Sequence, residues 1–505
     1  MNSLHFGTIK KKTLKIYFVA LVYLVFIVSA LLNVDGRPAD LFWVVFFHPI
    51  VFLLTIGFII QDYLKQGYWF NISNFILLLI YIYMGLGSIH YFLYFHDLPH
   101  ETLKNPSFAM KSMIVVCLAA LAFRLCSKSV LSRFIAGIIP AKSKTPHLSN
   151  RIRFGVLIAV AISIIVKIYF IASGKFGFIS SDGGGEGVVV YGTMLSLLDQ
   201  LSYIGVLTGV YYWFSGEKLT KFDKCFLMIV IVLLLLFALM NGMKAKVLHV
   251  ILLIVIPAII LGIKQNKRLI PLRYYAAIAV LFFSFWAINP LIRAAMVLTQ
   301  SSTVYEAVVN AGVSAGEASG ALKTISSDND FLEKQFYQIW HRVSLFSFLN
   351  SVVAQTGGIE NKYRGWERYP YLPFAIVPRA IFPNKPSDDY SAQFNLDYIS
   401  HVYNSTTPST IGWAYMESGF ISVILLMALL AIFYGAIDHY AFKRSRSSLF
   451  GVLVFGVFFI RSANLEPDPY WTLSSLPQLG LLIFLAYVVI FLNFKVNDSK
   501  GSPVI

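Results

Sequence analysis

The chain has 505 residues, of which 57% are hydrophobic and only 13% charged, and its mean hydropathy is +0.69. Soluble domains carry a charged fraction of about 25%, so the composition excludes an ordinary soluble domain and predicts a polytopic membrane protein. The 3 cysteines form no CxxC or zinc-ligand pattern, which argues against a disulfide framework and a structural metal site.

Apolar runs of about 20 residues are long enough to cross the hydrocarbon core of a bilayer. The first run follows four lysines, is too long for the core of a signal peptide and has no small-residue cleavage site, so we interpret it as a retained span. Twelve runs predict twelve membrane-spanning helices: Leu14–Asn33, Leu41–Gln61, Asn74–Phe95, Ala109–Leu125, Phe154–Ala172, Thr193–Phe214, Cys225–Met240, Val247–Ile263, Tyr274–Leu298, Ile411–Ile437, Leu449–Ile460 and Ser474–Asn493.

Lysine and arginine residues concentrate in alternate loops between the predicted spans. One set of loops, with the adjoining span ends, holds 24 of them, whereas the short loops of the other set hold 7. Because cytoplasmic loops carry the excess of Lys and Arg, both termini are predicted to be cytoplasmic. Most of the net charge of +16 then faces the cytoplasm and anionic lipid, so nucleic acid is not an expected partner.

The long hydrophilic interval 299–410 falls on the outer side in this topology. Loops of such length are usually functional or carry structure of their own. The segment Glu306–Ile325 is a plausible helix, and Phe331–Val353 has the spacing of an amphipathic helix lying at the membrane surface. The expected fold class is therefore all-α polytopic membrane protein, with transmembrane helices 1–9 in residues 1–298, a large periplasmic loop in 299–410 and helices 10–12 in 411–505.

A proline-rich stretch, Tyr369–Pro386, lies within this interval. Its five prolines forbid a regular helix and favour a rigid, extended path. Arg379 and Lys385 lie on that path, and fixed cations on a stiff backbone can hold an anion without reorganising. A purely structural cap over a helix bundle is the alternative interpretation.

Charged residues near the outer ends of the predicted spans are also candidates for function, because charge is costly in lipid. Lys167 lies in the fifth span, where it can snorkel or pair, and Glu417 is a candidate buried carboxylate. For any single residue, a structural ion pair or an interfacial anchor is the alternative.

The candidate cations together predict a positively charged outer vestibule that suits an anionic, lipid-attached substrate such as a pyrophosphate. Lys244 and Lys246 are placed in a tight outer turn, and Arg461 opens the last outer loop. The predicted substrate-binding residues are Lys244, Lys246, Arg293, Arg342, Arg364, Arg368, Arg379, Lys385 and Arg461.

Three motifs carry a resemblance to a known family. Pro378-Arg-Ala-Ile-Phe-Pro-Asn-Lys-Pro386 resembles the Pro-Arg-x-x-x-Pro-x-Lys-Pro signature of Wzy-type oligosaccharide repeat-unit polymerases, the O-antigen and exopolysaccharide polymerase family. The turn Asn241-Gly-Met-Lys244 is similar to a turn between two middle spans of those proteins, and the segment Thr410–Gly419 resembles the one that follows their long loop. Glu417-Ser-Gly419 stands where Asn-Phe-Gly is expected, which leaves the role of Glu417 open.

The resemblance implies a multi-pass glycosyltransferase of the bacterial inner membrane. It would transfer a growing glycan from undecaprenyl pyrophosphate to the next lipid-linked repeat unit on the periplasmic side, without a metal, a nucleotide sugar or another cofactor. The expected partners are the lipid-linked oligosaccharide, membrane lipid and a chain-length regulator. The acceptor hydroxyl needs a general base, for which the candidates on the outer side are His341, Glu417, Glu466 and Asp468.

Two other functions remain open. An O-antigen-ligase-like transferase would use the same donor chemistry with a different acceptor. A lipid-linked-glycan flippase or other transporter would not be an enzyme; transporters favour paired repeats and polar sites near the membrane midplane, whereas this sequence has no obvious repeat and only Lys167 deep in a span.

Overall fold

The structure is a computed structural model, and it describes most of the predicted helices but only parts of the long interval. The described residues are 39–94, 106–139, 148–173, 197–240, 244–265, 269–271, 344–356, 363–375, 407–445, 448–462 and 464–492, with the single positions Val22, Val25, Leu195, Val280, Val377, Phe382 and Phe394.

Throughout these residues the secondary structure is helical, without a β-strand. The helices of the first half are α2 (Ala39–Phe52), η1 (Leu53–Gly57), α3 (Phe58–Gln66), α4 (Ile72–Ile80), η2 (Tyr81–Leu86), α5 (Gly87–Tyr94), α6 (Pro106–Ser127), α7 (Val130–Ile138), α8 (Asn150–Ala172), α10 (Leu201–Ser215), α11 (Lys221–Met240) and α12 (Lys244–Gln265). The helices of the second half are α17 (Phe346–Thr356), η4 (Tyr369–Phe374), α19 (Ser409–Ser418), α20 (Phe420–His439), η5 (Tyr440–Arg444), α21 (Leu449–Ser462), α22 (Pro469–Tyr487) and η6 (Val488–Leu492).

Eight helices in the described residues are long and apolar enough to cross a membrane. This confirms that the described part of the chain is all-helical and contains several candidate membrane-spanning helices. Two further predicted spans correspond to the shorter helices α10, of 15 residues, and α21, of 14 residues. The predicted spans Leu14–Asn33 and Tyr274–Leu298 lie almost entirely outside the described residues, so the number twelve stays a prediction.

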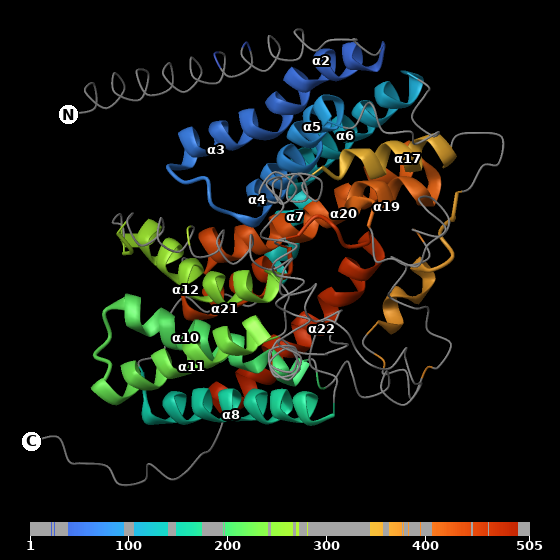
Figure 1. Ribbon diagram of the computed structural model, residues 1–505. Helices are drawn as coiled ribbons and strands as arrows, with labels where there is room; N and C mark the ends of the chain where they lie inside the picture. The colour runs from blue at the N-terminus through green and yellow to red at the C-terminus, as the bar shows by residue number, and fades with distance from the viewer. Residues whose placement is uncertain are drawn as a thin grey trace, which may run out of the picture.

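The helices form two groups that are joined by α21 and α22 (Figure 1). In one group α6 packs against α2, α4 and α20, and in the other α10 packs against α8, α11 and α12. Helix α21 contacts α10 and α12 on one side and α20 on the other. The apolar faces of all these helices share one continuous core, in which Trp413, Phe455 and Phe459 are among the large side chains that are fully buried.

Polar residues at helix starts show why several helices begin where they do. The first backbone N–H groups of a helix have no partner within the helix, and a side-chain oxygen at the N-cap can accept from them. Asn71 caps α4 in this way, Ser129 caps α7, Ser149 caps α8 and Asp468 caps α22.

The predicted span Ile411–Ile437 differs from the structure, in which the chain forms two helices. Helix α19 ends at Ser418 and α20 begins at Phe420, because Gly419 has a φ of 72°, which does not continue a right-handed helix. A side chain at this position would also collide with Tyr363, whose Oη lies 2.9 Å from an ideal Cβ. The break therefore gives a tyrosine from the long interval access to the helix backbone.

The predicted surface helix Phe331–Val353 also differs, since its described part does not lie on a surface. Helix α17 starts at Phe346 and packs against α5, α6 and α19, with Leu349 and Val353 fully buried. Asn350 accepts a hydrogen bond of 2.8 Å from Ser112 of α6. Residues 331–343 lie outside the described part.

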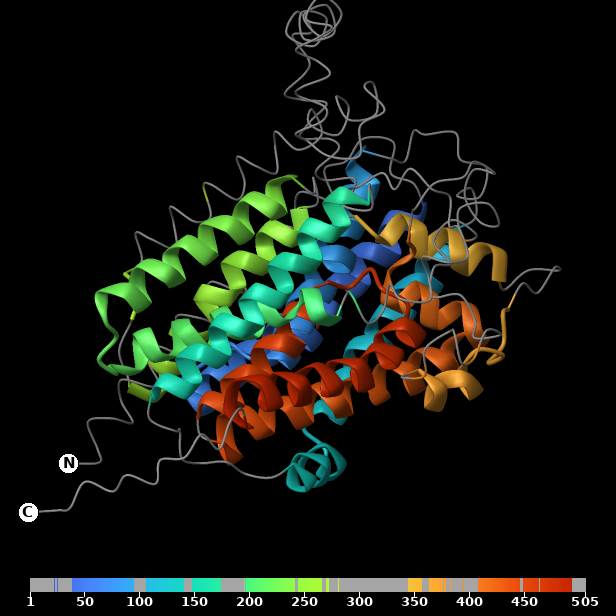
Figure 2. The same cartoon turned by 90° about the horizontal axis from the view of Figure 1, so that it is seen from below.

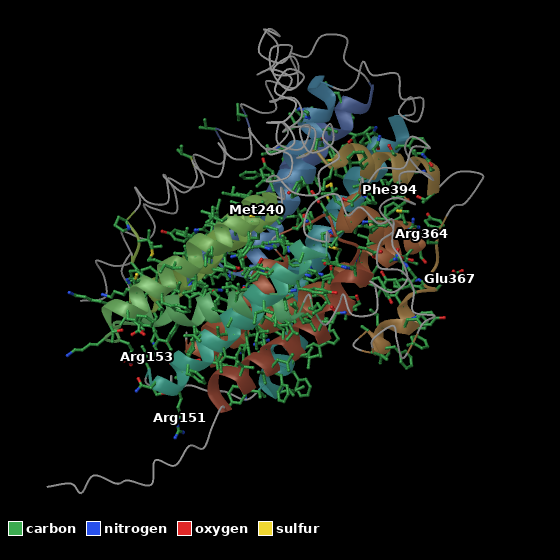
Figure 3. The ribbon with its side chains drawn as sticks, turned by 60° about the horizontal axis from the view of Figure 1, so that its bottom comes forward. Arg151, Arg153, Met240, Arg364, Glu367 and Phe394 are labelled. Atoms are coloured by element: carbon green, nitrogen blue, oxygen red, sulfur yellow. The ribbon has the colours of Figure 1, made fainter. Side chains whose placement is uncertain are left out.

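The two ends of the bundle carry different residues. Figure 3 shows Arg151 and Arg153, at the start of α8, at one end, and Arg364, Glu367 and Phe394 at the opposite end. The first two residues belong to the loops that are predicted to be cytoplasmic, and the other three to the long interval that is predicted to lie outside. The segregation agrees with the loop assignment.

Candidate functional site

The C-terminal end of α19 holds a short segment of the long interval against the bundle. The last carbonyl groups of a helix have no partner within it, and two of them are satisfied here from outside. Arg364 donates its backbone N–H to the carbonyl oxygen of Met416 at 2.8 Å, and Gly365 donates to that of Glu417 at 2.9 Å. Residues 363–368 are thereby fixed across the end of the helix that carries Glu417.

This attachment places Arg368 between two carboxylates. Its Nη2 lies 2.9 Å from Oε1 of Glu417, and its Nη1 lies 2.7 Å from Oδ2 of Asp468. All three residues are buried, with relative exposures of 7% for Arg368, 1% for Glu417 and 6% for Asp468. The three charges come from the long interval, from α19 and from the start of α22.

Asp468 is itself held in place by the start of α22. Its Oδ1 accepts the backbone N–H of Tyr470 at 2.8 Å as the N-cap, which leaves Oδ2 directed at Arg368. The preceding loop is tied to α19, because the Thr410 hydroxyl donates to the carbonyl oxygens of Leu465 at 2.9 Å and Pro467 at 2.7 Å. The positions of Glu417 and Asp468 are therefore coupled through backbone contacts as well as through Arg368.

The arginines at this end of the bundle also lie over aromatic rings. Distances from the guanidinium carbon to the ring centroid are 4.9 Å for Arg364 over Trp413, 5.2 Å for Arg368 over Tyr470 and 3.3 Å for Arg461 over Trp471. Such cation–π contacts orient a planar guanidinium without neutralising its charge. This end therefore combines oriented cations, carboxylates and flat apolar surfaces.

Burial shapes the charge state of Glu417, which precedes the membrane span that begins at Phe420. Removal from water raises the pKa of Glu417 to about 7; the nearby Arg368 lowers it and Asp468 raises it further. Burial by itself would lower the pKa of Arg368, but the carboxylates of Asp468 and Glu417 raise it overall. Glu417 thus has a proton affinity suited to accepting a proton near neutral pH.

A second charged group lies between α8, α10, α12 and α21. Lys167 of α8 forms an ion pair with Asp199, just before α10. Lys246, in the first turn of α12, lies close enough to Asp199, Lys167 and Arg461 for their charges to act on it. Lys167 is paired with Asp199 in this group, and Lys246 and Arg461 bring two further positive charges close to that pair.

The predicted site residues fall into three classes. Glu417, Asp468, Arg364, Arg368 and Arg461 lie at the same end of the bundle, and Arg461 also lies near Lys246. Glu466 belongs to the loop before α22, where its backbone N–H and its carboxylate contact Asn464. The predicted residues that lie outside the described part are His341, Arg293, Arg342, Arg379 and Lys385.

Two expectations on individual residues change with the structure. Lys244 and Lys246 were expected in a tight turn, whereas α12 begins at Lys244, so both positions belong to its first turn. Arg368 was expected to bind substrate, yet its guanidinium faces two protein carboxylates and is therefore suited to orienting Glu417 and Asp468.

Sequence reasoning missed Asp199 and His249. Asp199 lies 32 residues from Lys167, so only the packing of α10 on α8 brings the two together. His249 lies on α12 close enough to Lys246 and Arg461 for their charges to act on it. The spacing Lys246-x-x-His249 is i, i+3 on a helix, which places both residues on one face and could have indicated the histidine.

Comparisons with known proteins add no relative: no protein-family model, no curated protein and no solved structure matches this chain.

Proposed function

We propose that this chain is a membrane glycosyltransferase that polymerises undecaprenyl-pyrophosphate-linked oligosaccharide repeat units on the periplasmic side of the bacterial inner membrane. The proposal includes twelve spans and cytoplasmic termini. The observation that supports it most directly is the buried Glu417–Arg368–Asp468 cluster beside Arg364 and Arg461. It combines a carboxylate able to take a proton with cations able to receive a leaving anion.

In the proposed reaction, the acceptor hydroxyl of one lipid-linked repeat unit attacks the anomeric carbon of the glycan on the donor lipid. A new glycosidic C–O bond forms, and the bond between the anomeric carbon and the pyrophosphate oxygen breaks. The hydroxyl proton goes to Glu417 or Asp468, and the released polyprenyl pyrophosphate keeps the bonding electron pair. No oxidant, reductant or energy-carrying co-reactant is needed, because the pyrophosphate is already an activated leaving group.

The cations of the site would assist departure of the pyrophosphate. Arg364, Arg461 and Lys246 are candidates for neutralising the negative charge that develops on it, and pre-oriented charges in a water-poor site do so without reorganising. Arg368 has a different role in this proposal: it keeps the two carboxylates oriented. The aromatic rings of Trp413 and Trp471 hold Arg364 and Arg461 in place.

The test uses the full-length protein in proteoliposomes with a lipid-pyrophosphate oligosaccharide as both donor and acceptor, and a gel that resolves chain length. If one of the two carboxylates is the base, Glu417→Gln or Asp468→Asn lowers the polymerisation rate on the order of 10²-fold or more. The matched control is Glu367→Gln, which removes an exposed carboxylate from the same segment and should leave the rate unchanged. Full polymer from both buried-site variants would contradict the proposed general base.

Arg379 and Lys385 in the proline-rich stretch complete the proposed anion site. The guanidinium of Arg379 can grip a phosphate through two N–H groups, which lysine cannot reproduce. Arg379→Lys is therefore expected to leave single unpolymerised repeat units in cells at matched protein levels, whereas Lys264→Ala at the predicted cytoplasmic face should have no effect. Full-length polymer from Arg379→Ala would remove this residue from the mechanism.

Two control assays separate the alternative functions. An O-antigen-ligase-like enzyme would transfer the glycan to a different acceptor but not to a second repeat unit. A flippase would move the lipid-linked oligosaccharide across the proteoliposome membrane without forming a glycosidic bond. Either result, without polymer, would overturn the polymerase proposal.

A further inference from the structure

Helix α7 presents an apolar face away from the protein. Val130, Leu131, Phe134 and Ile138 are exposed by 72%, 50%, 65% and 68%, respectively, whereas Ser132 and Ala136 are buried. At 100° per residue, the four exposed positions fall within a 100° arc of the helix. An apolar arc that the protein does not cover needs another apolar environment.

The orientation of α7 matches that of a helix in a membrane interface. In Figure 2 this teal helix, at the bottom of the picture, is seen nearly end-on, while the long helices of the bundle run across the view. It therefore lies crosswise to the helices that are expected to span the membrane. Arg444 fastens it to the bundle by donating a hydrogen bond of 3.0 Å to the carbonyl oxygen of Ala136.

A polar cavity of about 210 Å³ lies behind this helix, at the end of α6 and α20. Three cationic side chains, Lys128, Arg133 and Lys443, contribute to its wall. Each of them is exposed, so the cavity opens to the surrounding medium. Its other lining groups include the hydroxyls of Ser127 and Ser132 and the imidazole of His439.

The carboxylates near this cavity already have partners. Asp62 forms two hydrogen bonds of 2.8 Å with Arg124 and an ion pair of 3.0 Å with Lys128. Asp438 lines the cavity itself, and its carboxylate accepts hydrogen bonds from the backbone N–H groups of Ile72 at 2.8 Å and Ser73 at 2.9 Å in the first turn of α4. Among the described residues, neither Arg133 nor Lys443 has a carboxylate within ion-pair distance.

We propose that α7 and this cavity form a binding site for an anionic phospholipid of the inner leaflet, with its phosphate between Arg133 and Lys443 and its acyl chains against the apolar face of α7. Charge complementarity identifies the headgroup, because surface cations attract anionic lipids. The exposed apolar arc next to the cavity identifies a lipid instead of a soluble anion, since a soluble phosphate would leave Phe134 and its neighbours in water. The site is distant from the Glu417–Arg368–Asp468 cluster and does not depend on the proposed reaction, whereas its assignment to the inner leaflet rests on the proposed cytoplasmic termini.

The test is native mass spectrometry of the purified full-length protein in detergent, with added phosphatidylglycerol or phosphatidylcholine of identical acyl chains. The wild type is expected to bind phosphatidylglycerol more tightly. The double variant Arg133→Gln/Lys443→Gln should lose that preference, with affinity for phosphatidylglycerol lower by roughly tenfold or more.

The matched control is Arg151→Gln/Lys221→Gln, which removes two exposed cations from α8 and α11, neither of which lines the cavity. It should retain the preference. An equal loss in both double variants would show an unspecific charge effect and overturn the proposal. Displacement of the lipid by millimolar inorganic phosphate would also overturn it, because the site would then recognise a soluble anion.

A second measurement does not depend on the lipid affinity. A spin label is attached at Phe134→Cys or Lys443→Cys, in a background in which Cys117, Cys126 and Cys225 are serine, and the protein is reconstituted into phosphatidylglycerol-containing vesicles. The label at position 134 should be more accessible to oxygen, which concentrates in the hydrocarbon, and the label at 443 to a water-soluble nickel complex. Equal, water-like accessibility at both positions would contradict the placement of α7 in the membrane interface.

Discussion

Arg368 and Glu417 are 49 positions apart in the sequence and form a buried ion pair with an Nη2–Oε1 distance of 2.9 Å. The pair depends on the end of α19, whose terminal carbonyls bind the backbone of residues 364 and 365 and so bring residue 368 over Glu417. Asp468 completes the arrangement from the start of α22. A segment of the long interval is thereby joined to two helices by backbone contacts and by charge.

The first prediction concerns the stability of this cluster. Arg368→Met keeps an elongated side chain but leaves Glu417 and Asp468 buried without their cation, so the free energy of unfolding should fall by about 3–5 kcal/mol. Thermal unfolding of the purified protein in detergent measures the effect. The triple variant Arg368→Met/Glu417→Gln/Asp468→Asn removes the uncompensated charge and should recover part of the loss. Equal unfolding temperatures for the wild type and Arg368→Met would contradict a buried, structurally coupled pair.

The second prediction is a dependence of stability on pH. The pKa of Glu417 rises from its ordinary value of 4.5 to about 7 in the folded protein, chiefly through burial. Between these two values the folded state binds more protons than the unfolded state, so the contribution of Glu417 to stability falls as the pH rises through this window. The unfolding temperature of the wild type should therefore drop more between pH 5 and pH 8 than that of Glu417→Gln, which cannot titrate there. Identical drops in the two proteins would exclude the raised pKa.

The third prediction concerns the break between α19 and α20. Gly419→Ala places a Cβ at a φ of 72° and 2.9 Å from Oη of Tyr363, so it should destabilise the protein by at least about 1–2 kcal/mol. Gly480→Ala is the matched control, because it lies within α22 with no atom within 4 Å of the added Cβ; in a helix it should be neutral or slightly stabilising. Comparable unfolding temperatures for the two variants would show that the break does not require glycine.

The fourth prediction concerns orientation in the membrane. Reporter fusions after Lys142 and after Gly357 should report the cytoplasm and the periplasm, respectively. The loop that contains Lys142 belongs to the set of loops that is much richer in Lys and Arg, and such loops face the cytoplasm. Alkaline phosphatase is active only after export, and a fluorescent protein that folds only in the cytoplasm gives the complementary signal. Cytoplasmic activity at position 357 would reverse the orientation and place the Glu417 cluster on the wrong side for the proposed reaction.

The membrane class and the positions of most spans follow from the sequence alone. Helices within a bilayer must satisfy their own backbone hydrogen bonds and present apolar side chains, so hydropathy over about 20 residues is a local signal that needs no knowledge of packing. Arg151 and Arg153 lie at one end of the bundle and Arg364 and Glu367 at the opposite end, which agrees with the orientation of the loops predicted from their charges. Glu417 and Asp468 were also recognised as candidates, because charge near a span is costly.

Which charges meet was decided by the tertiary structure. The pairing of Arg368 with Glu417 and Asp468, and that of Lys167 with Asp199, joins residues whose separation in sequence carries no signal. Gly419 was recognised only as the last residue of the motif segment Thr410–Gly419, yet its positive φ splits the predicted span and lets residues 363–368 dock. Hydropathy depends on each residue by itself, whereas an ion pair depends on the mutual position of two helices, and that position is determined by packing of the whole core.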